Sequence, residues 1–130
     1  MIQISGKVIK GDGFGKKLGY PTANLDRREY VRKKMKVRLG IYAGFAEIGL
    51  RFKVQGSRKY RSAIVIGPLD KHHLPRIEAH LINFTGNLYG KKITVTLKKY
   101  LRPFKKFKTI NALKNQIAAD VKKVRSLNYG

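Results

Sequence analysis

The chain has 130 residues, enough for one domain with a hydrophobic core, and it contains no cysteine, which excludes disulfides and thiolate metal sites. Thirty basic residues stand against seven acidic ones, a net charge of +23 of the kind that usually indicates nucleic acid or another anionic surface as a partner, although we do not favour nucleic acid here. No N-terminal apolar run resembles a signal peptide, and no stretch is long enough to cross a membrane. We therefore expect a monomeric, cytoplasmic protein without a membrane partner.

Short runs of β-branched and aromatic residues, bounded by turn-forming residues, predict strands. The six predicted strands are residues 2–9, 40–48, 50–54, 60–66, 77–84 and 93–100. The run from Ile93 to Leu97 alternates between apolar residues and threonine, so we expect one face to be buried and the other to be wet. Six short strands separated by turn signals predict a small barrel or sandwich.

The end of the chain has the apolar period of a helix rather than that of a strand. One stripe consists of Ile110, Leu113, Ile117, Val121 and Val124. Thr109 is a suitable N-cap for this helix, which we expect at about 110–127. Asp120 lies beside the stripe, and we expect it to pair with Lys123 or Lys114 on the surface.

Basic residues concentrate in two segments. Residues 27–38 hold seven of them and are the likeliest mobile insertion. Residues 98–108 hold six, interleaved with Tyr100, Phe104 and Phe107. Aromatic and cationic side chains in this mixture suit a platform for single-stranded nucleic acid, whereas the alternative is a solvated surface whose aromatic rings pack inward.

A glycine run follows the first predicted strand. Gly11, Gly13 and Gly15 alternate, which lets a backbone turn sharply and approach a bulky anion, and Lys16 and Lys17 add positive charge. The run matches neither a Walker A loop, because only three residues separate Gly11 from Gly15, nor a Rossmann fingerprint, which should open a helix. A glycine-rich hairpin is the alternative interpretation.

The segment after the glycine run carries two polar side chains. Pro21 favours an extended backbone, on which Thr22 and Asn24 point the same way. A hydroxyl and an amide oxygen beside a phosphate-binding loop suit Mg²⁺, which takes few protein ligands and completes its shell with phosphate and water.

Glu78 is the strongest candidate for a general base among the seven carboxylates. It interrupts an apolar strand between Ile77 and Ala79, and partial burial makes a carboxylate a better proton acceptor. The alternative is a structural pair with Arg76 or another cation. His80 would face the same side of the strand as Glu78 and could help to orient a site there.

Six ordered motifs along nearly the whole chain resemble the riboflavin kinase family of the bacterial and eukaryotic type. The string Gly-x-Gly-x-Gly-x-x-Leu-Gly-x-Pro-Thr-Ala-Asn-Leu at 11–25 comes first, and the others lie at 40–44, 62–67, 77–84, 88–90 and 101–107. A helix with Gln116, Ile117 and Asp120 closes the resemblance.

The resemblance implies one domain over residues 1–130, mainly β. Its fold would be a six-stranded antiparallel Greek-key barrel with strands within about 2–100, a flavin loop at about 101–108 and a C-terminal α-helix. The implied activity is that of a riboflavin kinase, which transfers the γ-phosphate of ATP to the ribityl 5'-hydroxyl of riboflavin and releases FMN and ADP. A small basic nucleic-acid-binding barrel is the alternative.

The resemblance also implies a role for each site residue. Glu78 would be the catalytic base, and Thr22 and Asn24 would hold Mg²⁺. The nucleotide would be bound by Gly11, Gly13, Gly15, Lys16, Lys17, Gly19, Pro21, Thr22, Asn24, Leu81, Asn83 and Tyr89. The flavin would be bound by Arg102, Lys105 and Phe107.

Three features depart from the family pattern. The loop at 68–75 is altered, Asn83 stands where aspartate is common, and Phe104 stands where the flavin loop often has glutamate. Bacterial members are often fused to an FMN adenylyltransferase, for which the sequence has no room and no His-x-Gly-His motif. We therefore expect no FAD synthesis.

Overall fold

A computed structural model describes residues 2–49 and 58–129 of the chain. Along these residues run β1 Ile2–Ile9, α1 Phe14–Lys17, β2 Ala23–Leu25, α2 Arg28–Arg32, β3 Gly40–Ile48, β4 Arg58–Leu69, β5 Pro75–Leu81, β6 Lys92–Arg102 and α3 Ile110–Ser126. β1 and β3 have the predicted bounds, β5 ends three residues early, and β6 extends into the predicted flavin loop. The strand predicted at 50–54 lies outside the described residues.

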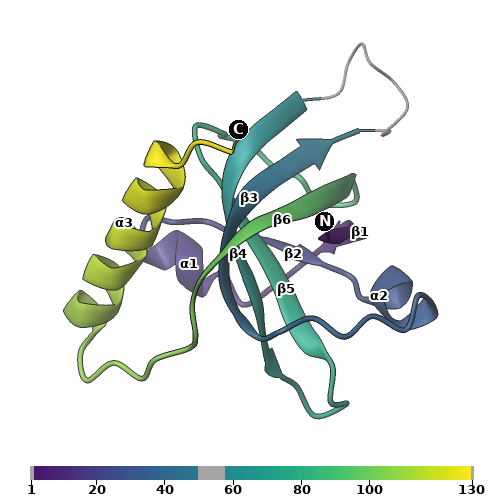
Figure 1. The fold of residues 1–130 in the computed structure, drawn as a ribbon, viewed down its shortest axis with the longest axis horizontal. Helices are drawn as coiled ribbons and strands as arrows, with labels where there is room; N and C mark the ends of the chain where they lie inside the picture. The colour runs from purple at the N-terminus through teal and green to yellow at the C-terminus, as the bar shows by residue number, and fades with distance from the viewer. Residues whose placement is uncertain (1, 50–57, 130) are drawn as a thin grey trace.

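The strands form a closed antiparallel barrel in the order β1-β2-β5-β4-β3-β6 (Figure 1). β1 closes it by pairing with β2 on one side and with β6 on the other, where Ile2 stands opposite Leu97. The predicted six-stranded antiparallel barrel with a C-terminal helix is confirmed.

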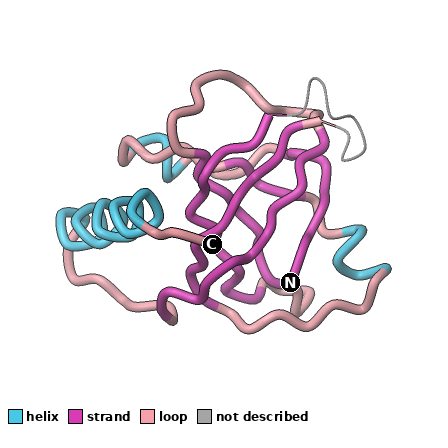
Figure 2. The backbone as a smooth tube through the Cα atoms, turned by 45° about the horizontal axis from the view of Figure 1, so that its top comes forward, coloured by secondary structure: helices cyan, strands magenta, loops and turns pink. Residues whose placement is uncertain are grey.

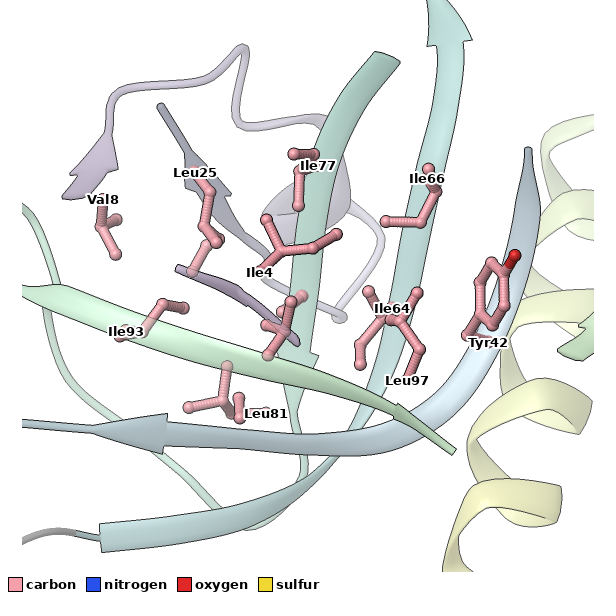
Figure 3. Packing of buried hydrophobic residues seen from close by; sticks show 14 of the residues in the cluster. Ile4, Val8, Leu25, Tyr42, Ile64, Ile66, Ile77, Leu81, Ile93 and Leu97 are labelled. Atoms are coloured by element: carbon pink, nitrogen blue, oxygen red, sulfur yellow. The ribbon is translucent and has the colours of Figure 1, made fainter. Parts of the chain in front are cut away.

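The barrel interior is filled by branched apolar side chains (Figure 3). The most deeply buried are Ile4, Leu25, Ile64, Ile66, Ile77, Ile93 and Val95. Along β5, buried and partly exposed residues alternate, so Ile77 and Ala79 face inward while Glu78 faces outward. The strand period thus places polar side chains of β5 on the outer surface of a packed core.

Helix α3 lies outside the barrel (Figure 2), where it contacts β4 and β3. Val121 and Val124 of the helix pack on Ala43 and Ala63 of the strands in a second apolar cluster. Alanines at these positions let the helix approach the sheet closely. Thr109 caps α3 as predicted, because its side chain accepts a hydrogen bond from the Ala112 N–H at 3.0 Å.

The outer face of β6 is not wet, contrary to expectation. Thr94 and Thr96 are both buried. The hydroxyls of Ser5 and Thr94 are 2.7 Å apart, and Gln3 Nε2 donates to Thr96 Oγ1 at 3.2 Å. Side chains of the neighbouring strand therefore satisfy the threonines and cover them, so that both faces of β6 are shielded here.

The basic segment at 27–38 is part of the folded domain, and the expectation of a mobile insertion was wrong. It contains α2, whose Tyr30 is buried in the main core together with Val37. The Tyr30 hydroxyl accepts a hydrogen bond from the Val37 N–H at 3.2 Å. One aromatic side chain thus anchors a segment whose other side chains are mainly charged.

Candidate active site

The pairing of β2 with β5 brings Thr22, Asn24 and Glu78 together. Ala23 stands opposite Ala79, and Asn24 stands opposite Glu78. Thr22 Oγ1 donates a hydrogen bond of 2.9 Å to Glu78 Oε1. The hydroxyl proton is used in this bond, which leaves the oxygen lone pairs of Thr22 open to a cation.

The glycine run packs directly on Asn24. A Cβ added to Gly11 would lie 2.2 Å from Asn24 Nδ2, so only glycine lets the backbone pass this close to the amide. Beyond it, Gly13 takes a left-handed conformation with φ of 73° and starts α1, one short helical turn. The glycine run belongs to the connection between the antiparallel strands β1 and β2, as the interpretation of a glycine-rich hairpin expects, and this connection contains a helical turn.

Two charged groups flank Glu78 on the outer face. Arg76, also on β5, has its Nε 3.8 Å from Glu78 Oε2 and its Nη2 3.5 Å from Asp12 Oδ2. Asp12 belongs to the glycine run and accepts a hydrogen bond from the Phe14 N–H at 2.9 Å. This bond, with help from Arg76, holds the pKa of Asp12 below its ordinary value.

His80 fixes the segment that leads into Thr22. Its Nδ1 lies 2.8 Å from the carbonyl oxygen of Pro21, and its ring meets that of Tyr20 edge to face at 5.5 Å. Because β2 begins only at Ala23, the residues just before it are held by these contacts of His80 rather than by strand pairing. The sequence placed His80 on the Glu78 side of the strand but gave no sign of this contact.

A cleft of about 570 Å³ opens beside Thr22. It is lined by eight of the predicted nucleotide-binding residues: Gly11, Gly13, Lys16, Pro21, Thr22, Asn24, Leu81 and Tyr89. The lining also includes Val8, Ala23, Ala79 and the segment 84–88, which were not among the predicted nucleotide-binding residues. Gly86 within that segment is the one feature that could have marked a functional loop.

Not every predicted nucleotide-binding residue reaches this cleft. Gly15, Lys17 and Gly19 are absent from its lining, although they belong to or follow α1. Asn83 lies in a turn with φ of 66° and lines a separate basic hollow with Arg61. The structure therefore does not bring the Asn83 side chain to the cleft.

The expectation that Asp120 pairs with a lysine on the surface was wrong. Asp120 is buried and binds Arg102 at the end of β6. Arg102 donates through both Nε and Nη2, the latter at 2.7 Å from Asp120 Oδ2, and Gln116 adds a bond of 3.0 Å. This forked ion pair ties the start of the predicted flavin loop to α3. The guanidinium of Arg102, which was predicted to bind the flavin, is thus bound to Asp120.

Of the aromatic side chains in the second basic segment, Tyr100 packs inward, whereas Phe104 is exposed. Tyr100 meets Tyr42 edge to face at 5.2 Å and donates to the Leu39 carbonyl oxygen at 3.1 Å. The ring of Phe104 lies over Gly67, about 3.1 Å from the position that a Cβ would take there. The packing of Tyr100 agrees with the inward-packing interpretation of the segment, and the exposure of Phe104 does not.

Metal binding here would depend on few protein groups. Among residues 2–49 and 58–129, no cluster of three or more histidine or acidic side chains could hold an ion. The oxygens of Thr22 and Asn24 instead match an ion whose remaining ligands are phosphate and water. Within the described ranges, no helix is both long and apolar enough to span a membrane.

The closed antiparallel barrel thus carries a glycine loop, a cleft and an outward carboxylate that accepts a hydrogen bond from a threonine hydroxyl. The family model described as flavokinase, riboflavin kinase, matches residues 1–128. The chain therefore belongs to the riboflavin kinase family.

Curated relatives agree with this assignment. The chain is 36% identical to the bifunctional riboflavin kinase/FMN adenylyltransferase of Buchnera aphidicola subsp. Schizaphis graminum, over 94% of this chain and 37% of that protein. It is 32% identical to riboflavin kinase of Mus musculus, over 92% of this chain and 76% of that protein. The chain thus spans little more than a third of the bifunctional relatives, and the expectation of no FAD synthesis stays a prediction.

Solved structures share the fold. A Streptococcus pneumoniae protein named as a macrolide-efflux protein superposes with a TM-score of 0.78 at 27% identity, covering 97% of this chain and 39% of that chain. Riboflavin kinase from Trypanosoma brucei superposes with a TM-score of 0.71 at 23% identity, covering 95% and 76%. Nothing in these comparisons favours the nucleic-acid-binding alternative.

Proposed function

We propose that the chain transfers the γ-phosphate of ATP to the ribityl 5'-hydroxyl of riboflavin, giving FMN and ADP. One observation carries this proposal within the family: the hydrogen bond that joins Thr22, at the edge of the cleft, to Glu78, on the outer face of the barrel. Phosphoryl transfer needs mainly positioning and charge stabilisation, and this bond connects the nucleotide side to the acceptor side.

The cleft is the proposed nucleotide site. Gly11, Gly13 and Lys16 would surround the phosphates, because the glycines expose backbone and the lysine supplies positive charge. Leu81 and Tyr89 would contact the adenine end. Gly15, Lys17 and Gly19 would contribute by shaping the loop rather than by lining the cleft, and Asn83 would act through its backbone.

Thr22 and Asn24 would hold Mg²⁺ with the phosphate oxygens. The fit rests on the donor set: a hydroxyl whose proton already goes to Glu78, and an amide fixed against Gly11. When bound, the ion would neutralise part of the phosphate charge at the edge of the cleft.

Glu78 would accept the proton of the ribityl 5'-hydroxyl. The hydroxyl oxygen forms a bond to the γ-phosphorus, and the bond from this phosphorus to the bridging oxygen of ADP breaks, with its electron pair leaving on ADP. The Thr22 hydrogen bond fixes one oxygen of Glu78, so that the other remains directed to the acceptor side.

The flavin would lie between the outer surface of the barrel, the flavin loop and α3. Phe107 would stack on the planar ring system, and Lys105 would add charge near the phosphate of the product. Arg102 would set the direction of the loop through its ion pair with Asp120. A cytoplasmic location and a monomeric state stay predictions.

The decisive experiment incubates the purified protein with riboflavin, ATP and Mg²⁺ and separates the flavins by chromatography. We expect FMN only when all components are present. Omitting ATP and omitting Mg²⁺ are the controls. Protein that is folded by circular dichroism but yields no FMN with ATP or any other nucleoside triphosphate would refute the proposal.

A further inference from the structure

Arg76 stands between two carboxylates without binding either tightly. Its guanidinium is 3.5 Å from Asp12 and 3.8 Å from Glu78, both near the upper limit for an ion pair. The side chain is 40% exposed, so its charge loses little hydration energy, and its flexible stem lets the guanidinium turn. A stronger anion nearby would compete easily for this cation.

The position of Arg76 is on the acceptor side of the proposed reaction. Arg76 and Glu78 are two residues apart on β5 and share the outer face. Asp12 belongs to the glycine run, which packs on Asn24. The guanidinium is therefore held where the glycine run, the proposed metal ligands and the proposed base meet, while Lys16 supplies positive charge inside the cleft.

We propose that Arg76 is a further catalytic residue, which leaves Asp12 and binds the terminal phosphate of the nucleotide during transfer. This inference rests on the proposed function and deepens it. A guanidinium fork matches phosphate oxygens in a bidentate manner, and a phosphate carries more charge than the exposed carboxylate of Asp12. Arg76 takes part in no bond exchange and stabilises the negative charge on the transferring group.

Binding measurements without turnover test the contact. Isothermal titration compares a non-hydrolysable ATP analogue with ADP, each with Mg²⁺, on wild-type protein and Arg76→Ala. We expect the variant to bind the triphosphate analogue on the order of tenfold more weakly and ADP almost unchanged, because only the former carries the terminal phosphate. The matched control is Arg125→Ala, which removes one exposed arginine from the last turn of α3.

Three outcomes of the titration would overturn the inference. One is an equal loss of affinity for both nucleotides, which would indicate a general effect of charge. Another is no loss for either nucleotide. The third is a loss of the same size in Arg125→Ala.

Turnover provides a second readout. We expect Arg76→Ala to lower kcat on the order of 10²-fold, as for loss of one charge-stabilising donor. Added guanidinium should partly restore Arg76→Ala and leave the wild type unchanged, and Arg76→Lys should keep an intermediate rate because it lacks the fork. A kcat within about twofold of the wild type in Arg76→Ala would overturn the inference.

The variant Asp12→Asn tests the ion pair between Asp12 and Arg76 separately from the proposed catalytic role of Arg76. The amide oxygen still accepts the Phe14 N–H, but the negative charge that holds Arg76 is gone. We expect a lower KM for ATP than in the wild type, because Arg76 no longer has to leave a carboxylate to bind the nucleotide, whereas a higher KM would contradict the assigned order of events. If wild-type protein made no FMN, the proposed function would fail, and the nucleotide titration would still decide the role of Arg76.

Discussion

The Thr22 hydroxyl donates a 2.9 Å hydrogen bond to the Glu78 carboxylate across the β2–β5 pair, joining residues 56 positions apart in the chain. The bond connects the segment that follows the glycine run with the strand that carries the proposed base. In the proposed reaction, the acceptor hydroxyl would meet the nucleotide beside this bond.

Glu78→Gln removes the proposed base at nearly constant shape. The amide oxygen can still accept the Thr22 proton, so the fold and nucleotide binding should persist. We expect kcat for FMN formation to fall on the order of 10²–10⁴-fold, measured by steady-state kinetics. Glu47→Gln, which removes a charge on β3 away from the site, is the control, and near-normal turnover of Glu78→Gln would reject the assignment.

Asn24→Ala removes one proposed metal ligand. We expect the KM for the magnesium–nucleotide complex to rise and excess Mg²⁺ to restore part of the activity, because mass action offsets the weaker site. Titration of activity with Mg²⁺ measures this shift. Asn115→Ala, on the exposed surface of α3, is the matched control. A loss of activity that is independent of Mg²⁺ would point to another role.

Gly11→Ala tests the close packing of the glycine run. The new Cβ would lie 2.2 Å from Asn24 Nδ2, so the amide must move away. We expect the variant to resemble Asn24→Ala in its Mg²⁺ requirement, with a melting temperature close to that of the wild type. An unchanged Mg²⁺ titration would show that Asn24 does not need its present position.

The ion pair between Arg102 and Asp120 should stabilise the attachment of α3. Its side chains are only 15% and 10% exposed, so Asp120→Ala leaves a guanidinium that is poorly hydrated. We expect a loss of about 3 kcal/mol in the free energy of unfolding, measured with urea. The double variant with Arg102→Ala should lose less than the sum of the single changes; strict additivity would argue against a direct coupling.

Asp70 should make the free energy of unfolding depend on pH in the acidic range. A hydrogen bond from Arg27, with the N–H groups of His72 and Leu74, lowers the pKa of Asp70 from 3.8 to about 2. The unfolded state then binds more protons than the folded state in this range, so the contribution is complete above about pH 4 and is lost as the pH falls towards about 2. We would measure the free energy of unfolding with urea at a series of pH values. Below about pH 4 this free energy should depend less steeply on pH in Asp70→Asn than in the wild type. An equally steep dependence in both proteins would contradict the assignment.

Much of the fold could be predicted because apolar period and turn residues agree. β3 has the predicted bounds since its apolar run ends at Gly49, and α3 follows its stripe of apolar residues from the Thr109 cap. β2 is different: three residues are too few for a periodic signal, and its conformation depends on pairing with β1 and β5. Tertiary contacts, rather than local preference, make it a strand.

The partners of site residues were harder to predict. A helical pattern reveals only neighbours on the same helix, so Asp120 was expected to pair with Lys123 or Lys114. The true partner, Arg102, lies 18 residues away at the end of β6 and becomes a neighbour only when α3 packs on the barrel. Thr22 and Glu78 were grouped through family resemblance, because nothing local connects them.

The pairing of β1 with β6 has a consequence for synthesis of the chain. Ile2 to Gly6 pair with Leu97 to Ile93, so the strand of the barrel that is synthesised first must wait for the one that is synthesised last. Until β6 has been synthesised, one edge of β1 remains unpaired and the barrel cannot close. Contacts between such distant segments also make folding slow compared with helical proteins of similar size, which lengthens the time during which chaperones can bind.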